Sequence, residues 1–293
     1  MKIAIAGGTG TVGNHLTGIA RERGHEVVVL SRSTGADLVS AAGLPAALDG
    51  VAAVIDVTGV QTQSSAKSRA FFGAVTRNLL DAERDAGVAH HLALGIVGSD
   101  LAPFGYYAGK VAQEERVEAG PVPWTILRAT QFHEFAAQVF GQYRFGPFVL
   151  IPSMRSQPVA AREVAERLLE LAVGEPQGRV RDLAGPEQHR MIDMVERYVA
   201  RTGSSGRLVQ IPVPGGFGRA LRDGTLLPVG CHDEGAQTFG EWLEALLPLL
   251  NRAGPPTAPA DSAARRRCST RQTAGTPRAR SQAGSGRCTP VGR

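Results

Sequence analysis

Short apolar runs alternate with amphipathic stretches along the first half of the chain. The first run, residues 2–6, leads into a stretch in which Val12, Leu16 and Ile19 recur at helical spacing and share one face. Other apolar runs predict strands at 26–31, 52–57, 91–97 and 124–128, with a shorter one near 36–39, and amphipathic stretches predict helices at 65–86 and 107–119. This alternation predicts an α/β fold built on a doubly wound parallel sheet.

After residue 131 the alternation becomes less regular. Amphipathic spacing there predicts helices at 132–140, 162–173 and 239–250, joined by connections rich in glycine and proline. We therefore expect a domain at 1–130 and a smaller C-terminal subdomain, residues 131–253, packed on its sheet.

The last forty residues differ in composition from the rest of the chain. Of the 32 basic and 27 acidic residues, the segment 254–293 holds eight arginines and one acid, so residues 1–253 carry 24 basic and 26 acidic residues. The segment has no aromatic residue, leucine or isoleucine. We expect it to be a disordered basic tail, and nucleic acid to be an unlikely partner because no aromatic side chain is available to stack on bases.

Hydropathy and cysteine content exclude several classes of protein. No apolar run approaches the length of a membrane span, and the N-terminal run is too short for a signal peptide. Cys231, Cys268 and Cys288 form no metal or redox motif. These features favour a cytoplasmic protein without a metal site, whose oligomeric state the sequence leaves open.

A glycine at every third position follows the first predicted strand. Gly7 permits the sharp turn off the strand, Gly10 allows a ligand to approach the backbone, and Gly13 lets helix and strand pack tightly. The helix N-terminus offers free N–H groups and partial positive charge to phosphates. Strand, glycines and helix together predict a dinucleotide site of the Rossmann type; the alternative is a tight turn without a ligand. The loop also contains Thr9, Thr11 and Val12.

The end of the second predicted strand indicates which nicotinamide cofactor is preferred. An acid at this position accepts a hydrogen bond from the ribose 2′-hydroxyl, whereas an arginine accommodates a 2′-phosphate. The sequence Ser31-Arg32-Ser33 supplies a permanent charge and two hydroxyls but no acid. We therefore expect NADP(H) to be favoured over NAD(H); the alternative is that Arg32 is a solvated loop residue.

Tyr106 and Lys110 are four residues apart, which places them on one face of a helix. An ammonium beside a phenol stabilises the phenolate and lowers the phenol pKa from about 10 toward neutrality. Tyr106 could then exchange a proton while hydride moves to or from nicotinamide, and Lys110 could also bind the nicotinamide ribose. The alternative is an aromatic pair at a helix start with a surface lysine.

Ligands of open α/β sheets bind beyond the carboxyl ends of the strands. Among the residues in the loops expected there, Thr58 is a candidate cofactor contact. Candidate substrate contacts are Gln131, Phe132 and His133, with Tyr143, Phe145 and Phe148 as an apolar wall. The subdomain 131–253 would thus lie on the substrate side. A buried structural histidine is the alternative for His133.

The spacing Gly7-x-x-Gly10-x-x-Gly13 and the pair Tyr106-x-x-x-Lys110 resemble the short-chain dehydrogenase/reductase superfamily. The resemblance is to its extended and atypical branches, including the NmrA-like (nitrogen-metabolite-repression regulator-like) proteins. It covers roughly residues 1–250 in the order of elements. The resemblance implies a Rossmann fold and a nicotinamide cofactor.

The resemblance also implies two further positions. Asp37 stands where the superfamily has an acid near the adenine, whose amino group it could bind; the alternative is a plain helix cap. The superfamily places a serine at the end of the strand before the tyrosine, whereas in this chain Gly95 or its neighbour occupies that place, and Ser99 lies only seven residues before Tyr106. The missing serine puts the polarisation of a substrate carbonyl in doubt.

Three functions follow from these observations. The favoured one is an NADPH-dependent oxidoreductase that acts on a small organic substrate such as a carbonyl compound, with Tyr106 as acid or base and Lys110 assisting. The second is a non-catalytic NADP(H)-sensing regulator of the NmrA-like type. The third is a sugar-nucleotide epimerase or dehydratase, which the short C-terminal region and the missing serine disfavour.

Overall fold

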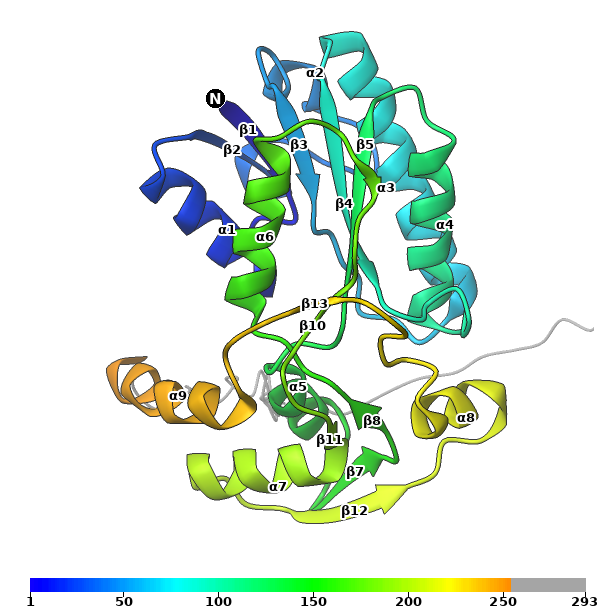
Figure 1. The fold of residues 1–293 in the computed structure, drawn as a ribbon, viewed down its shortest axis with the longest axis vertical. Coiled ribbons are helices and arrows are strands. Elements are labelled where there is room, and N and C mark those ends of the chain that lie inside the picture. The colour runs from blue at the N-terminus through cyan, green and yellow to red at the C-terminus, as the bar shows by residue number, and fades with distance from the viewer. Residues whose placement is uncertain (254–293) are drawn as a thin grey trace, which may run out of the picture. The chain divides into compact units, whose positions relative to one another are not determined.

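A parallel sheet forms the centre of the protein. The computed structural model describes residues 1–253, and their side chains as far as residue 246. The chain order of the strands reverses at β1, which lies between β2 and β3, and the pairs β2–β1, β1–β3, β3–β4 and β4–β5 are all parallel (Figure 1). The strands are β1 (Lys2–Ala6), β2 (Glu26–Leu30), β3 (Ala53–Asp56), β4 (His90–Ile96) and β5 (Trp124–Ala129). This is the predicted doubly wound α/β fold.

Three short strands extend the sheet beside β5. Strands β9 (Gly178–Arg179) and β10 (Leu183–Ala184) pair with β5, and β13 (Asp233–Glu234) pairs with β10, all in parallel. Segments far apart in sequence therefore meet at this edge of the sheet.

One face of the sheet is covered by α1 (Thr11–Glu22) and α6 (Ala161–Ala172), which lie side by side (Figure 1). Alternate strand residues point to this face, so Ile5 of β1 is buried in one cluster with Leu16 of α1 and Leu168 of α6. The burial of these apolar stripes fixes the helix N-terminus of α1 at the carboxyl end of β1.

The opposite face is covered by α2 (Leu44–Ala47), α3 (Ser65–Ala86) and α4 (Tyr106–Glu118) (Figure 1). Val54 of β3 packs there against Leu79 of α3. Helices α3 and α4 run in close contact, and this contact carries Tyr106 and Lys110.

A second layer lies beyond the carboxyl edge of the sheet (Figure 1). Val139, Met194 and Leu221 belong to its separate apolar core. The layer contains α5 (Phe135–Gln142), α7 (Met191–Thr202), α8 (Gly215–Asp223), α9 (Phe239–Ala253), the pair β8 (Arg155–Ser156) and β11 (His189–Arg190), and a sheet of β6 (Arg144–Phe145), β7 (Phe148–Pro152) and β12 (Arg207–Ile211).

The chain after residue 130 contributes to both layers. Helix α6 and strands β9, β10 and β13 complete the central sheet and its cover, whereas α5, α7, α8 and α9 form the second layer. Residues 1–253 form one compact unit. The predicted disordered tail, 254–293, lies outside the described residues.

The strand expected near residues 36–39 is absent from the described structure, and that prediction is wrong. The carboxylate of Asp37 accepts hydrogen bonds from the backbone N–H groups of Val39 and Ser40, at 2.9 and 3.3 Å. An aspartate that binds its own following backbone closes a turn and competes with strand pairing. No helix of the described part of the chain is long and apolar enough to cross a membrane.

Candidate functional site

The glycine-rich loop between β1 and α1 is packed against its surroundings at two of its three predicted glycines. Gly7 has a φ of +83°, and a Cβ on it would lie 2.7 Å from the carbonyl oxygen of Val57. A Cβ on Gly13 would lie 2.1 Å from the carbonyl oxygen of Gly7. The fold itself therefore requires glycine at both positions.

Gly10 is different, because little within the protein requires a glycine there. Its φ of −80° suits any residue, it is exposed, and a Cβ would meet only the carbonyl oxygen of Gly7 within 4 Å, at 3.3 Å. Helix α1 has no side-chain cap and no acid in its first turn. Its start, at Thr11, Val12 and Gly13, thus suits close approach of an anion, and the loop fits the pyrophosphate of a dinucleotide.

The end of β2 forms a short turn rich in hydroxyl groups. Ser31 Oγ lies 2.9 Å from Ser33 Oγ and 3.1 Å from Thr34 Oγ1. Arg32 is exposed, and its guanidinium makes no hydrogen bond or ion pair with any residue that the structure describes. The predicted contacts with a 2′-phosphate are thus gathered on one exposed turn. The Asp37 carboxylate closes the turn described above, and no helix begins there, so it is not a helix cap.

The end of β3 connects the glycine loop to the helix that carries Tyr106. Thr58 lies against Gly7, whose Cβ would approach the Thr58 backbone to 2.9 Å. One residue further, a Cβ on Gly59 would lie 3.3 Å from the Tyr106 hydroxyl oxygen. The structure therefore brings together three of the regions that were predicted to contact cofactor or substrate.

Helix α4 is held against α3 by a glycine within the Tyr106–Lys110 stretch. A Cβ on Gly109 would lie 2.1 Å from Ser68 Oγ, and the Ser68 hydroxyl donates to the carbonyl oxygen of Tyr106 at 2.8 Å. This contact buries Lys110, whose Nζ lies 4.9 Å from the Phe72 ring centroid. The ammonium donates its hydrogen bond to Gln113. Tyr106 and Lys110 share a helix, as predicted, but no hydrogen bond joins them.

The surroundings of Tyr106 act against the predicted lowering of its pKa. Burial raises the pKa of the Tyr106 phenol, and the nearby Asp56 carboxylate and Tyr107 raise it further. Burial lowers the pKa of Lys110 to about 8, against the opposing effect of Asp56 and Glu114. Burial, Asp56 and Tyr107 thus act on the Tyr106 pKa in the direction opposite to the one expected from Lys110.

An ion pair occupies the space beside Gly95, the position at which the resemblance leads us to expect a serine. Glu114 is 1% exposed and accepts hydrogen bonds from Arg128, the shortest 2.6 Å long, and from Arg179 at 2.9 Å. Ser99 is fully buried, and its hydroxyl has no hydrogen-bond partner among the described residues. Neither position therefore presents a hydroxyl in place of the missing serine.

The three predicted substrate residues have different environments. The Gln131 side chain lies 3.5 Å from the Tyr107 hydroxyl and accepts from Ser156 Oγ at 3.0 Å. Phe132 packs at the edge of the core between the sheet, α1 and α6. Gln131 thus stays close to α4 and remains a candidate contact.

His133 is fully buried and has a structural environment. Its Nε2 donates to the carbonyl oxygen of Gln237 at 3.1 Å, and its ring packs against Phe239 and Trp242. Burial lowers its pKa to about 4. His133 therefore anchors the start of α9 rather than facing a substrate, and its prediction as a substrate contact is corrected.

The predicted aromatic wall is only partly assembled. Tyr143 accepts a hydrogen bond from Gln63 at 3.2 Å and packs on the core of the second layer, but Phe145 and Phe148 are exposed on the hairpin of β6 and β7. The aromatic residue that sequence reasoning missed is Phe217 of α8, whose ring lies 5.6 Å from that of Tyr107.

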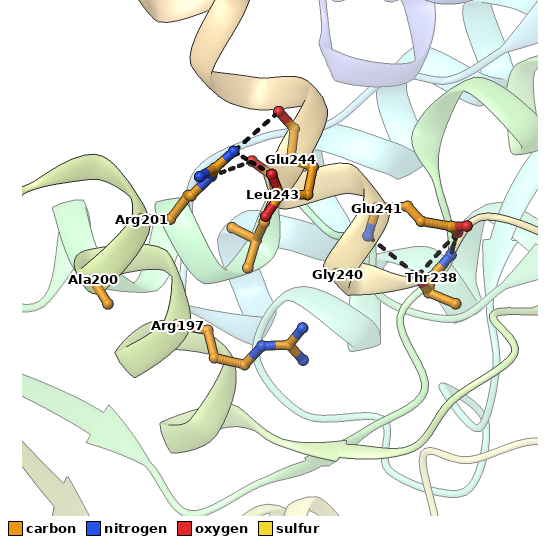
Figure 2. A pocket seen from close by; sticks show the side chains of 8 residues that line it. All are labelled: Arg197, Ala200, Arg201, Thr238, Gly240, Glu241, Leu243 and Glu244. Carbon is orange, nitrogen blue, oxygen red and sulfur yellow. Dashed lines mark hydrogen bonds and ion pairs between the residues drawn. The ribbon is translucent and has the colours of Figure 1, made fainter.

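A hollow between α7 and α9 is lined by none of the predicted residues (Figure 2). Figure 2 shows Arg201 directed at Glu244 and at the carbonyl oxygen of Leu243, and Thr238 paired with Glu241. Arg197 stacks over the Phe239 ring at 5.2 Å, and the other polar groups named here pair with one another, so we assign no ligand to this hollow.

Comparison with solved structures shows the fold alone, because identities are low. A short-chain dehydrogenase/reductase superfamily protein from Agrobacterium tumefaciens with bound NAD has a TM-score of 0.61 and 19% identity, covering 86% of this chain and 98% of that one. An Escherichia coli NADPH-dependent quinone oxidoreductase has a TM-score of 0.57 and 16% identity, covering 84% and 99%. The UDP-glucose 4-epimerase of Thermotoga maritima, solved with UDP-glucose, has a TM-score of 0.64 and 15% identity, covering 86% and 99%.

No curated protein sequence matches the chain. A family model described as NAD(P)H-binding matches residues 7–172, which is more than half of the chain and extends from the glycine loop to the end of α6. The chain therefore belongs to the NAD(P)H-binding family.

Proposed function

We propose that the protein is an NADPH-dependent oxidoreductase that acts on a small carbonyl compound. The observation that best supports this proposal is that the glycine loop packs against the end of β3, which in turn packs against Tyr106. A Cβ on Gly7 would touch the Val57 carbonyl oxygen at 2.7 Å, and a Cβ on Gly59 would come within 3.3 Å of the Tyr106 hydroxyl. A dinucleotide bound along the loop would thus be directed toward Tyr106.

Each part of this edge has a task in the proposed reaction. The backbone around Gly10 and the start of α1 bind the pyrophosphate, and Arg32 with its neighbouring serines binds the 2′-phosphate. Lys110 binds the nicotinamide ribose. Bound NADPH supplies the hydride.

Tyr106 supplies the proton in the proposed reaction. A phenol with a raised pKa is fully protonated at neutral pH, which is the form that donates to a substrate oxygen. Because neither Gly95 nor Ser99 presents a hydroxyl, Tyr106 would act without a second hydroxyl donor from these positions.

The test is NADPH oxidation by the purified protein with a panel of quinones, aldehydes and ketones. Oxidation that depends on one of these substrates and is lost in Tyr106→Phe would support the proposal. Quinones belong in the panel because a structural neighbour is described as an NADPH-dependent quinone oxidoreductase.

A second candidate is a non-catalytic NADP(H) sensor. The raised pKa of Tyr106 and the glycine in the serine position favour it, because both weaken acid catalysis. Tight NADPH binding without oxidation by any member of the panel would support the sensor. An epimerase, the activity named for another structural neighbour, would instead convert UDP-sugars without net oxidation of the cofactor.

A further inference from the structure

Four buried polar side chains form a hydrogen-bonded chain between the end of β3 and α4. Asp56 accepts from the Thr58 backbone N–H at 2.9 Å and from the Thr58 hydroxyl at 2.6 Å, both through Oδ1. The second carboxylate oxygen accepts from Gln113 Nε2 at 2.7 Å, and Gln113 Oε1 accepts from Lys110 Nζ. All four residues are at least nine-tenths buried.

A glutamine suits position 113 because it must donate to one neighbour and accept from the other. A carboxylate oxygen accepts hydrogen bonds, so Asp56 orients the Gln113 amide with its NH2 group toward β3 and its oxygen toward Lys110. A glutamate would present a second carboxylate to Asp56. An apolar residue would leave both Asp56 and the Lys110 ammonium with an unpaired buried group, which is costly.

We propose that Gln113 and Asp56 are positioning residues that hold the Lys110 ammonium over Phe72 for the cofactor. This inference rests on the proposed function for the role of Lys110, but the hydrogen-bonded chain itself does not. One ammonium donor is directed to Gln113, and two remain for the ribose hydroxyls. Thr58 is itself a predicted cofactor contact. The buried series of hydrogen bonds therefore connects two predicted cofactor contacts, Thr58 and Lys110.

The charges that face Lys110 come from two elements. Asp56 of β3 and Glu114 of α4 favour the ammonium form, while burial opposes it. Asp56 also acts on His91 of β4, whose pKa its charge raises, and His91 itself binds Glu83 of α3 at 2.9 Å. Among the described residues the Lys110 ammonium makes no direct ion pair: it contacts Gln113 and the Phe72 ring, and the carboxylates of Asp56 and Glu114 act on it from further away.

The hydrogen bond between Lys110 and Gln113 can be tested without any cofactor, because the protein has only three lysines. Lys2 is paired with Glu26, and Lys67 is exposed. In protein labelled with 13C-lysine, NMR titration should show one lysine with a pKa near 8. Gln113→Met should lower that pKa by about one unit, because it removes a hydrogen bond to the charged form.

Gln138→Met is the matched control, since Gln138 is exposed on α5, and it should leave the titration unchanged. If Gln113→Met does not fold, Asp56→Asn serves as the second variant. It removes a charge that favours the ammonium and should also lower the pKa. An unchanged Lys110 titration in whichever variant folds would overturn the contact.

The positioning role is tested by a double-mutant cycle on NADPH binding, measured by calorimetry. Gln113→Met should weaken binding about tenfold when Lys110 is present, the equivalent of one well-placed hydrogen bond. In the Lys110→Met background the same substitution should have little effect. Equal losses in both backgrounds, or no loss in either, would show that Gln113 is merely structural. Failure of the wild-type protein to bind NADPH would instead count against the proposed function, and the NMR titration would still decide the contact.

Discussion

The carboxylate of Glu114 lies where a side chain on Gly95 would have to be placed. A Cβ at residue 95 would lie 2.3 Å from Glu114 Oε1 and 2.8 Å from Cγ of Arg128. Strand β4 is paired with β5 at this point, with Gly95 opposite Arg128. The glycine is therefore explained by packing, because the ion pair of α4 and β5 crosses directly over the strand.

Gly95→Ala should destabilise the protein by about 1–3 kcal/mol, the usual cost of overpacking a buried site. Chemical denaturation measures the change. Gly73→Ala on α3 is the control, because a Cβ there meets nothing within 4 Å, and it should be neutral or stabilising. Equal changes in the free energy of unfolding for the two substitutions would mean that Glu114 and Arg128 move aside for the added methyl group at little cost.

Gly10→Ala and Gly13→Ala should separate binding from stability. Gly13→Ala forces a contact of 2.1 Å with the Gly7 carbonyl oxygen and should lower the melting temperature by several degrees. Gly10→Ala should leave the melting temperature nearly unchanged but weaken NADPH binding at least tenfold, since the methyl group meets the pyrophosphate. Undiminished NADPH affinity in Gly10→Ala would contradict the placement of the phosphates.

Arg32→Ala should remove most of the preference for NADPH. We expect the wild-type protein to bind NADPH at least tenfold more tightly than NADH, a difference of about 1.4 kcal/mol. The substitution should weaken NADPH binding and spare NADH binding, as calorimetry with both cofactors would show. Similar affinities of the wild-type protein for the two cofactors would refute the assignment of Arg32 to the 2′-phosphate.

Tyr106→Phe should lower turnover by about 10²–10⁴ on any substrate that the wild-type protein reduces, because it removes the proton donor and keeps the ring. NADPH affinity should barely change. Tyr107→Phe is the matched control, since its hydroxyl is only weakly paired, with Gln131 at 3.5 Å. Full turnover in Tyr106→Phe would mean that another group supplies the proton.

The buried Lys110 should make stability increase with pH above pH 8. The pKa of Lys110 is about 8 in the folded protein, whereas its ordinary value is 10.5. Between these values the unfolded chain binds more protons than the folded one, so the free energy of unfolding rises with pH. Urea unfolding between pH 7.5 and 10.5 should show this rise in the wild-type protein and a smaller one in Lys110→Met. Parallel curves would indicate that Lys110 titrates normally.

The fold could be predicted from the sequence because its signals are local. Strand β1, the glycine loop and α1 form a continuous pattern, and α3 was predicted with the bounds that the structure shows. The false strand at 36–39 has a local cause as well, namely the turn that Asp37 closes with its own carboxylate. Apolar character alone could not reveal that competition.

The candidate site was less predictable because it depends on contacts between distant residues. Spacing placed Tyr106 and Lys110 on one face of α4, but it could not show that the Lys110 ammonium donates to Gln113, which in turn donates to Asp56. A signal for Asp56 was available, since a carboxylate at the end of an apolar strand stands at the ligand edge of the sheet. No sequence signal showed that His133 packs against Phe239, which lies more than one hundred residues further along the chain.

The position of α6 sets a minimum length for folding during synthesis. Leu16 of α1 and Ile5 of β1 are fully buried in one apolar cluster with Leu168 and its neighbours on α6. A nascent chain that ends near residue 130 would expose this apolar surface although every strand from β1 to β5 has emerged. We expect protection of the sheet against a protease to arise only after residue 172 has left the ribosome.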